Sequence, residues 1–326
     1  MPSQDLAERI ESANAADPAF RKDILAGLST MPKATPARWL YDKRGSELFE
    51  EITALPEYYP TRVETELLRT HGEEIGRIVG SGRAVVEFGA GSAIKTPHLL
   101  SQIDPSAYVA VDISGDFLRE SSAVLSEAFP DLPVRPVEAD FNDPVDLPRD
   151  LAGLPRLGFF PGSTIGNLDP ADAVDLLRSF RRSLGQDAML LIGMDRIKDV
   201  SILIPAYDDA AGVTAQFNLN LLARINRELD GTIALDAFRH VASWNDDLAR
   251  IEMHLKAIRD TAFSVGRAHF SMRAGETIHT ENSHKYGPRG ARLLLNAGGW
   301  MPIREWTDAD GMFCLLLAEA KSKALT

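Results

Sequence analysis

The chain has 326 residues, of which 44% are hydrophobic and 25% charged, a balance that excludes a disordered chain, a collagen and a small disulfide-stapled protein. At about 150 residues per domain, this length predicts roughly two domains. The formal charge of −12 argues against a nucleic-acid partner, because an acidic surface repels phosphate backbones.

The first part of the chain is predicted to be mainly helical. Apolar residues recur at helical spacing over residues 5–29, where Gly27 and the following proline end the pattern. Ser46 is predicted to cap a short helix over residues 46–52, because a serine followed by early acidic residues suits a helix N-terminus. A further amphipathic helix is predicted over residues 61–80.

From residue 84 onward, short β-rich runs alternate with helices, which predicts a parallel sheet covered on both faces. The predicted strands are 84–88, 108–112, 134–137, 156–160 and 188–195. The helices between them are predicted through 99–103 and over 115–128 and 170–184.

The alternation stops after Asp195 and resumes near the end of the chain. Helices are predicted over roughly 199–229, followed by alternating apolar and polar residues at 238–244 and 251–255. The last predicted elements are a helix over 289–297 and strands over 301–306 and 312–318. Because an Asp-Gly turn joins these two strands, they predict an antiparallel hairpin at the sheet edge.

We therefore predict an α/β protein with two domains, each assembled from two segments. Residues 62–196 and 286–326 form a doubly wound sheet with an antiparallel C-terminal hairpin. Residues 1–61 and 197–285 form a second, α+β domain, and we expect the chemistry to occur between the two.

No targeting or membrane segment is predicted. The first twenty residues carry charges throughout, and no apolar run approaches the ~20 residues that span a bilayer. The single cysteine, Cys314, lies in an apolar run that predicts a buried strand, and it cannot form an internal disulfide. We expect a cytoplasmic monomer with neither a nucleic-acid nor a membrane partner.

The first predicted strand leads into a glycine loop. Gly89 and Gly91 open the following helix, which is a nucleotide-binding geometry, because glycine lets the backbone turn tightly and approach a ligand. The third glycine of a dinucleotide fingerprint is absent, since Ile94 stands in its place, and no Walker lysine pattern follows. Two glycines alone are also compatible with a plain turn.

Acidic residues at the ends of three strands make the signal stronger. Glu87 ends the first strand, and Asp112 ends the second, where a carboxylate could accept a ribose diol. Asp140 and Phe141 follow the third strand, where an adenine amino group and ring could bind. A nicotinamide dehydrogenase would account for Asp112 but not for the Asp140-Phe141 pair or the terminal hairpin. Each acid alone could be a surface carboxylate, but the set resembles class I S-adenosylmethionine-dependent methyltransferases.

The fourth predicted strand leads into a second candidate loop. Gly162 would let a ligand approach closely, and Asn167 offers both donors and an acceptor where ligands bind in doubly wound sheets. A plain turn with Asn167 as a helix cap is the alternative. The Asn/Asp-Pro-Pro-aromatic motif of many nucleobase and amide N-methyltransferases is absent, which argues against those substrates.

Other kinds of site have little support. His279, Glu281 and His284 lie close together, but in a segment that looks extended and with no third His or Cys at a ligand spacing, so no metal site is predicted. No Gly-x-Ser-x-Gly elbow of a serine hydrolase is present. The dense aromatic residues of 39–59 are ordinary core candidates, although aromatic faces also stabilise sulfonium and ammonium groups by ~0.5–2 kcal/mol.

Motifs along nearly the whole chain resemble those of the L-histidine Nα-methyltransferases of ergothioneine biosynthesis. They lie in residues 39–62, 162–167, 206–214, 251–253 and 280–283. The resemblance implies an enzyme that trimethylates the α-amino group of L-histidine, through its mono- and dimethyl forms, to hercynine. It implies S-adenosyl-L-methionine as methyl donor and S-adenosyl-L-homocysteine as product.

The resemblance also implies site residues. Those implied to bind substrate are Tyr41, Tyr58, Gly162, Asn167, Tyr207, Met253, Glu281 and Ser283. Those assigned a direct part in methyl transfer are Tyr41, Phe49, Asn167 and Tyr207. The strand ends and the resemblance together assign the cofactor to Tyr58, Glu87, Gly89, Gly91, Lys95, Asp112, Asp140, Phe141, Ser163 and Thr164.

Within this set, each end of the substrate has its own residues. The resemblance implies that Tyr41, Glu281 and Ser283 bind the imidazole, and that Asn167 and Tyr207 hold the carboxylate. Two alternatives stay open, namely a methyltransferase of the same fold acting on another amine, such as tryptophan, and a non-catalytic nucleotide-binding regulator. The polar pair Glu281 and Ser283 favours an imidazole over an apolar ring.

Overall fold

The computed structural model describes residues 17–321, which divide into two compact units. Unit 1 comprises the described residues of Met1–Ile52, Ile204–Trp244 and Glu252–Glu281. Unit 2 comprises those of Thr53–Leu203, Asn245–Ile251 and Asn282–Thr326. Each unit is thus assembled from separate segments, with bounds that differ from the predicted divisions at 61/62, 196/197 and 285/286. The assignment of substrate to one domain and cofactor to the other stays a prediction.

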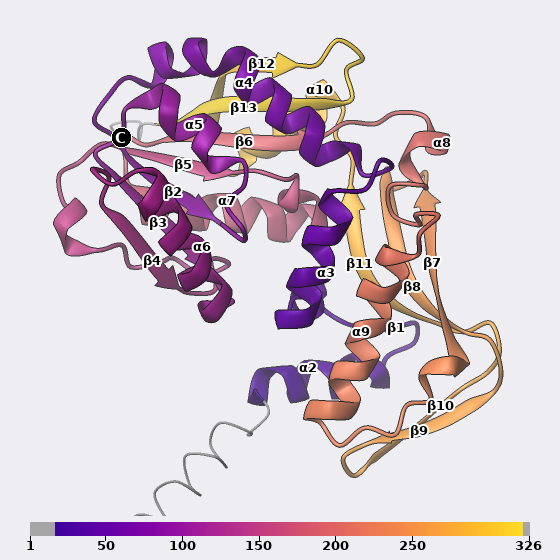
Figure 1. Cartoon of the computed structure of the whole chain (residues 1–326). Coiled ribbons are helices and arrows are strands. Elements are labelled where there is room, and N and C mark those ends of the chain that lie inside the picture. Colours follow the sequence, from indigo (N-terminus) through magenta and orange to yellow (C-terminus); the bar gives the residue numbers. More distant parts are fainter. Residues whose placement is uncertain (1–16, 322–326) are drawn as a thin grey trace, which may run out of the picture. The chain divides into compact units, whose positions relative to one another are not determined.

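Unit 2 contains seven strands in one sheet. They are β2 (Ala84–Phe88), β3 (Ala107–Asp112), β4 (Val134–Glu138), β5 (Arg156–Phe160), β6 (Met189–Asp195), β12 (Trp300–Thr307) and β13 (Phe313–Ala320). Their order across the sheet is β12-β13-β6-β5-β2-β3-β4 (Figure 1). β2 to β6 are parallel, whereas β13 is antiparallel to both β6 and β12. The predicted doubly wound sheet with an antiparallel C-terminal hairpin is confirmed, and it has the class I methyltransferase topology.

Helices cover both faces of this sheet. They are α4 (Tyr59–Val79), α5 (Thr96–Ile103), α6 (Gly115–Ala128), α7 (Pro170–Leu184) and α10 (Pro288–Ala297). α7 and α10 pack on one face, against residues such as Val86, and α4, α5 and α6 pack on the other, against residues such as Val85. Because successive strand residues point to opposite faces, β2 is buried along its whole length.

Aromatic side chains fill the core under α7. The rings of Phe88 and Phe180 stack with centroids 3.9 Å apart. Trp300 is fully buried, and its Nε1 donates to the carbonyl oxygen of Leu177 at 2.9 Å. Cys314 lies buried on β13, as the sequence predicts. Unit 2 also contains the short helices η2 (Arg149–Leu151), η3 (Thr164–Asn167) and α8 (Val200–Leu203).

Unit 1 combines helices with two small sheets. Its helices are α2 (Pro18–Ser29), η1 (Ala37–Leu40), α3 (Lys43–Thr53), α9 (Val213–Glu228) and η4 (Leu235–Ala237). Its strands are β1 (Lys33–Ala34), β7 (Phe238–Asn245), β8 (Arg250–Ala257), β9 (Thr261–Val265), β10 (Ala268–Met272) and β11 (Thr277–His284). One sheet has the order β1-β11-β8-β7, and the other pairs β9 with β10. Four of these elements cross into unit 2, namely α3, β7 and β11 with their last residues and β8 with its first residues. The α+β character predicted for this part is confirmed.

Helix starts differ from the sequence-based expectation in two places. α3 begins at Lys43, because the Asp42 carboxylate accepts from the backbone N–H of Gly45 at 2.8 Å, so the prediction of Ser46 as the cap is wrong. α2 begins at Pro18, preceded by Asp17 as its cap, and residues 5–16 of the helix predicted there lie outside the described residues. None of the helices in residues 17–321 has the length and apolarity needed to cross a membrane.

Candidate functional site

Several predicted cofactor residues follow the strand ends of unit 2. The parallel pairing of β2 with β3 and β5, and of β5 with β6, places the carboxyl ends of these strands at one edge, here called the carboxyl edge. Gly89 and Gly91 follow β2, Asp112 ends β3, and Ser163 follows β5. Ligands of doubly wound sheets bind at this edge.

Asp112 fixes the glycine loop. Its carboxylate accepts from the backbone N–H of Gly91 at 3.1 Å and from that of Ser114 at 2.9 Å. Gly89 and Gly91 both have a positive φ, which explains why glycine is needed there, and a Cβ placed on Gly91 would meet no atom within 4 Å. The loop therefore leaves open space beside an oriented carboxylate.

Phe141 borders the same loop. A Cβ on Gly89 would lie 3.5 Å from the Phe141 ring, whose other neighbours include Phe88 and Phe160 in edge-to-face contact. The preceding Asp140 accepts from the backbone and the side-chain amide of Asn142, at 3.0 and 2.7 Å. The ring and the carboxylate are both half-buried, and their part in adenine recognition stays a prediction.

A fully buried carboxylate outside the predicted set of site residues connects the segments of Lys95 and Gly162. Glu64 of α4 accepts from Lys95 Nζ at 2.5 Å and from the backbone N–H of Gly162 at 2.8 Å. A Cβ on Gly193 of β6 would lie 1.9 Å from its Oε1, so glycine is required there. The signal was available, because Glu64 occupies the apolar stripe that continues through Leu67 of α4.

Glu87 has a different environment from the one predicted. It is buried, and its Oε2 accepts from Thr96 Oγ1 at 2.6 Å and from the Tyr108 hydroxyl at 2.7 Å. Burial raises the pKa of Glu87 to about 7. These bonds join the start of α5 to β3, so Glu87 supports the glycine loop from inside the protein instead of presenting its carboxylate to solvent.

Asp195, at the end of β6, is the centre of a second buried ionic cluster. It pairs with Lys198 at 2.5 Å and Lys285 at 2.8 Å, and the Tyr59 hydroxyl donates to it at 2.6 Å. Burial alone would raise the pKa of Asp195, but the two lysines outweigh this effect and lower it. Burial also lowers the pKa of Lys198 to about 8.

This cluster holds two predicted site residues. The backbone N–H of Asp195 donates to Ser163 Oγ at 2.9 Å, and Lys285 Nζ donates to Ser283 Oγ at 2.8 Å. Ser163 has a φ of 57°, in the left-handed region, and follows Gly162 with a φ of 80°. The hydrogen bond to Asp195 thus stabilises the strained backbone of Gly162 and Ser163 and fixes the positions of the polar groups in this loop.

The remaining predicted residues of unit 2 lie in well-anchored loops. Thr164 Oγ1 donates to the carbonyl oxygen of Pro161 at 3.1 Å, and half-buried Asn167 ends η3. Tyr58 is 7% exposed and precedes α4, where its carbonyl oxygen accepts from Arg62 at 3.3 Å. The structure therefore places these residues but leaves their roles as predictions.

In unit 1, three predicted residues lie together. The Tyr41 hydroxyl donates to Glu281 Oε1 at 3.2 Å, and Glu281 is only 8% exposed. The Tyr41 ring contacts Phe49 and Phe217 edge to face, with centroids 5.6 and 5.3 Å apart. Phe217 was not predicted, because an aromatic residue on the apolar stripe of α9 looks like any core residue.

Tyr207 and Met253 are anchored through the backbone. His240 Nε2 donates to the Tyr207 carbonyl oxygen at 2.7 Å, and the Asn218 amide donates to His240 Nδ1 at 2.9 Å. These partners assign a neutral tautomer to His240, and burial lowers its pKa accordingly. Met253 is buried on β8, and its carbonyl oxygen accepts from Thr280 Oγ1 at 3.0 Å.

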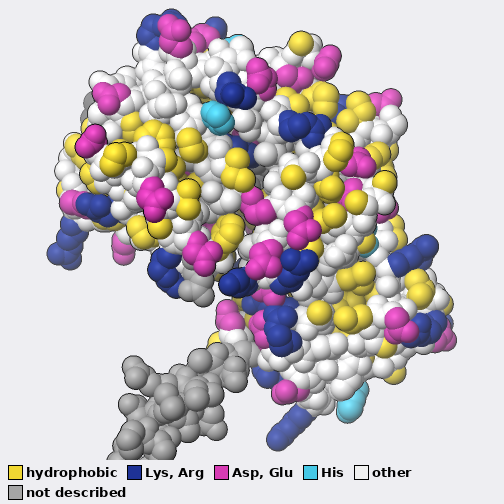
Figure 2. All heavy atoms as spheres, in the orientation of Figure 1, with side chains coloured by type: hydrophobic (Ala, Val, Ile, Leu, Met, Phe, Trp, Pro, Cys, Tyr) yellow, Lys and Arg dark blue, Asp and Glu magenta, His cyan; other side chains and the backbone are white. Residues whose placement is uncertain are grey.

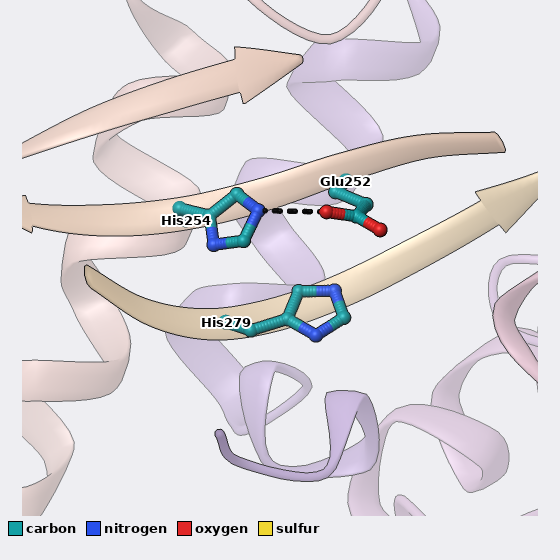
Figure 3. A group of neighbouring side chains, drawn as sticks. All are labelled: Glu252, His254 and His279. Atoms are coloured by element: carbon teal, nitrogen blue, oxygen red, sulfur yellow. Dashed lines mark hydrogen bonds and ion pairs between the residues drawn. The ribbon is translucent and has the colours of Figure 1, made fainter. Parts of the chain in front are cut away.

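The histidine-rich segment is extended, as predicted. The side chains beside its two histidines come from other parts of the chain. His279 of β11 lies beside Glu252 and His254 of β8, while Nδ1 of His284 pairs with the carbonyl oxygen of Leu248 in unit 2. Figure 3 shows the side chains of Glu252, His254 and His279 converging from the two strands.

On the face drawn in Figure 2, Lys and Arg side chains are interspersed with Asp and Glu.

Replacing Glu87 by Gln should change how stability depends on pH. Between pH 4.5 and about 7 the native state keeps a proton that the unfolded state has lost, so the wild-type free energy of unfolding falls as pH rises. The variant lacks this slope and keeps an oxygen for Thr96 and Tyr108. In urea unfolding, we expect the free energy of unfolding of the variant, minus that of wild type, to rise by about 2 kcal/mol from pH 5.5 to pH 7.5.

The control for this comparison is the exposed Glu73 of α4, where Glu73→Gln should give a difference that does not vary with pH. A Glu87→Gln difference that is equally constant across this range would contradict a buried, protonated carboxyl at Glu87.

Comparisons with known proteins agree with this arrangement. A family model described as histidine-specific, S-adenosylmethionine-dependent methyltransferase matches residues 20–320. The histidine N-alpha-methyltransferase of Mycolicibacterium smegmatis is 41% identical over 319 residues, covering 94% of this chain and 97% of that protein.

Two fungal relatives are more distant. Ergothioneine biosynthesis protein 1 of Neurospora crassa is 28% identical over 89% of this chain and 34% of its own length. The 4-dimethylallyltryptophan N-methyltransferase of Claviceps fusiformis is 23% identical over 87% of each chain. Since the family model spans nearly all of the described residues and the bacterial relative is 41% identical over 94% of the chain, the chain belongs to the histidine-specific, S-adenosylmethionine-dependent methyltransferases.

Proposed function

We propose that this enzyme trimethylates the α-amino group of L-histidine to hercynine, a step of ergothioneine biosynthesis. The observation that carries the proposal is the pair of Tyr41 and Glu281 in unit 1. A carboxylate can accept several hydrogen bonds, so Glu281 can accept from an imidazole N–H beside the Tyr41 hydroxyl that already donates to it. The aromatic rings of Phe49 and Phe217 beside the pair suit a flat ring and a cationic ammonium product.

The carboxyl edge of unit 2 suits S-adenosylmethionine. Asp112 would accept from the ribose hydroxyls, Asp140 and Phe141 would contact the adenine, and Gly89 and Gly91 provide close approach. The remaining residues assigned to this ligand are Tyr58, Lys95, Ser163 and Thr164, with Glu87 supporting the loop from inside. A Cβ on Gly162 would lie 3.5 Å from both Lys95 Nζ and Thr164 Oγ1, which supports grouping these residues around one ligand.

The other substrate contacts follow the resemblance. Asn167 and Tyr207 hold the carboxylate of histidine, Ser283 is a second contact to the imidazole, and Gly162 and Met253 shape the pocket. Asn167 has an amide that donates to a carboxylate, and Tyr207 has a hydroxyl that does the same.

Methyl transfer from a sulfonium to an amine is an in-line displacement, and the bound cofactor supplies the electrophilic methyl group. The chain's own task is to hold the neutral amine in line and keep water away, with Phe49 beside the nitrogen. Fixing two reactants in this way can contribute about 7–11 kcal/mol of the barrier. We propose no obligatory general base, because the amine loses its proton to water before each of the three rounds.

We also propose that the enzyme acts as a cytoplasmic monomer on small molecules. The single cysteine is buried and unpaired with any other, which suits a reducing compartment, and burial raises its pKa to about 11, which keeps the thiol inert.

The proposed reaction is tested by supplying S-adenosylmethionine with each of the twenty amino acids and detecting added methyl groups by mass spectrometry. We expect products with one, two and three methyl groups from histidine and none from tryptophan, because an imidazole has both a donor and an acceptor nitrogen, whereas an indole has one N–H donor and no acceptor. Preferential methylation of tryptophan or another amino acid would replace the proposed substrate, and methylation of none would favour a nucleotide-binding regulator.

Glu281→Ala should lower kcat/KM for histidine at least about tenfold, because the imidazole N–H loses its acceptor. The affinity for S-adenosylmethionine, measured by calorimetry, should stay unchanged, which separates this effect from misfolding. The exposed Glu73→Ala is the matched control and should have wild-type kinetics. Wild-type turnover of histidine by Glu281→Ala would remove Glu281 from imidazole recognition.

Asp112→Ala should chiefly weaken cofactor affinity, by about 10–100-fold, because charge-assisted hydrogen bonds contribute roughly 1.5–3 kcal/mol. Titration calorimetry of S-adenosylhomocysteine into the variant measures this, with the exposed Asp131→Ala as control. An unchanged dissociation constant would move the ribose contact to another residue.

A further inference from the structure

We propose that Glu252, His254 and His279 form a binding site for a divalent transition metal of the zinc type, apart from methyl transfer. One ligand atom from each side chain lies within 4.8 Å of the others, all three residues are half-buried, and all belong to unit 1. It is the one such group of three found within residues 17–321. Two histidines and one glutamate are the protein ligands of many zinc centres that keep a fourth position open.

The strands hold the three ligands in position. Glu252 and His254 are two residues apart on β8 and therefore point to the same side, and His279 extends from the adjacent strand β11 (Figure 3). His254 and His279 stack with centroids 4.8 Å apart and an interplanar angle of 28°. Tetrahedral zinc holds its nitrogen and oxygen ligands about 3.3 Å apart. Rotations of the three side chains would bring the ligand atoms from within 4.8 Å of one another to this spacing.

The hydrogen bonds of His254 leave it free to become a ligand. Its Nε2 lies 3.2 Å from Glu252 Oε2, and its Nδ1 is buried with no hydrogen-bond partner among the described residues. The Glu252 carboxylate can only accept, so it holds the proton of neutral His254 on Nε2 and leaves the lone pair on Nδ1, which is available to a metal. Methyl transfer does not account for a buried His254 Nδ1 that has no partner among the described residues.

The donor set also selects the class of metal. Imidazole nitrogens favour zinc, cobalt, nickel and copper, whereas magnesium and calcium prefer sites made only of oxygen ligands. The site lies next to Glu281 along β11, where His279 Nε2 donates a hydrogen bond to the carbonyl oxygen of Glu281 at 3.2 Å. A bound ion would therefore stiffen the strand that carries Glu281.

The test uses the full chain without a histidine tag, freed of metal by a chelator and titrated with Zn²⁺ in a calorimeter and with Co²⁺ in a spectrophotometer. We expect one ion per chain with a micromolar or tighter dissociation constant, the visible bands of tetrahedral Co²⁺, and a higher melting temperature with Zn²⁺. Mg²⁺ at the same concentrations should produce none of these.

Matched histidine variants separate this site from adventitious binding. His254→Ala and His279→Ala should each weaken Zn²⁺ binding at least about tenfold, and Glu252→Gln should do the same while keeping the side-chain shape. His269→Ala changes an exposed histidine of β10 and should bind Zn²⁺ like wild type. Absence of Zn²⁺ binding in the wild-type chain, or equal binding by all four variants, would overturn the proposal.

Discussion

The buried carboxylate of Glu64 is the constraint on which the carboxyl edge of unit 2 depends. An ionised carboxylate taken out of water costs several kcal/mol unless charges and hydrogen bonds compensate. Here the compensation comes from Lys95 and from the backbone of Gly162, and the space comes from Gly193, which has no Cβ. One side chain thus fixes helix α4, the start of α5, the loop after β5 and strand β6 relative to one another.

Asp195 repeats this arrangement one strand along. Two lysines and a tyrosine hydroxyl satisfy its carboxylate, and its backbone holds Ser163 in a left-handed conformation. Both lysines pair with the one carboxylate, and Lys285 extends the cluster to Ser283. Oriented polar groups need no reorganisation when a ligand arrives, which is how a protein lowers a barrier without a reactive residue of its own.

The fold could be predicted from the sequence wherever periodicity decided it. Apolar runs such as that of β2 and the turn before Phe313 predicted the parallel sheet and the hairpin. Caps were harder, because Asp42 and Ser46 both suit a helix N-terminus and only the backbone path selects Asp42. Similarly, the sequence placed Glu87 at a strand end but did not reveal that its carboxylate faces Thr96 in the interior.

The site was predictable where motifs are local and not where it depends on strand pairing. Gly91 and Asp112 were recognised from their spacing, and the structure brings them into contact. His279 had no partner at a ligand spacing along its own strand, because its neighbours Glu252 and His254 come from β8. Such groupings depend on sheet register, which sequence spacing does not reveal.

The central claim is that the enzyme places methyl groups on the α-nitrogen of histidine and on no other atom. The most direct measurement supplies S-adenosylmethionine with a deuterated methyl group and L-histidine, and then locates the label by fragmentation mass spectrometry and NMR. We predict three labelled methyl groups, all on the α-nitrogen, with an unmodified imidazole. A label on an imidazole nitrogen, or a product that never exceeds one methyl group, would contradict it.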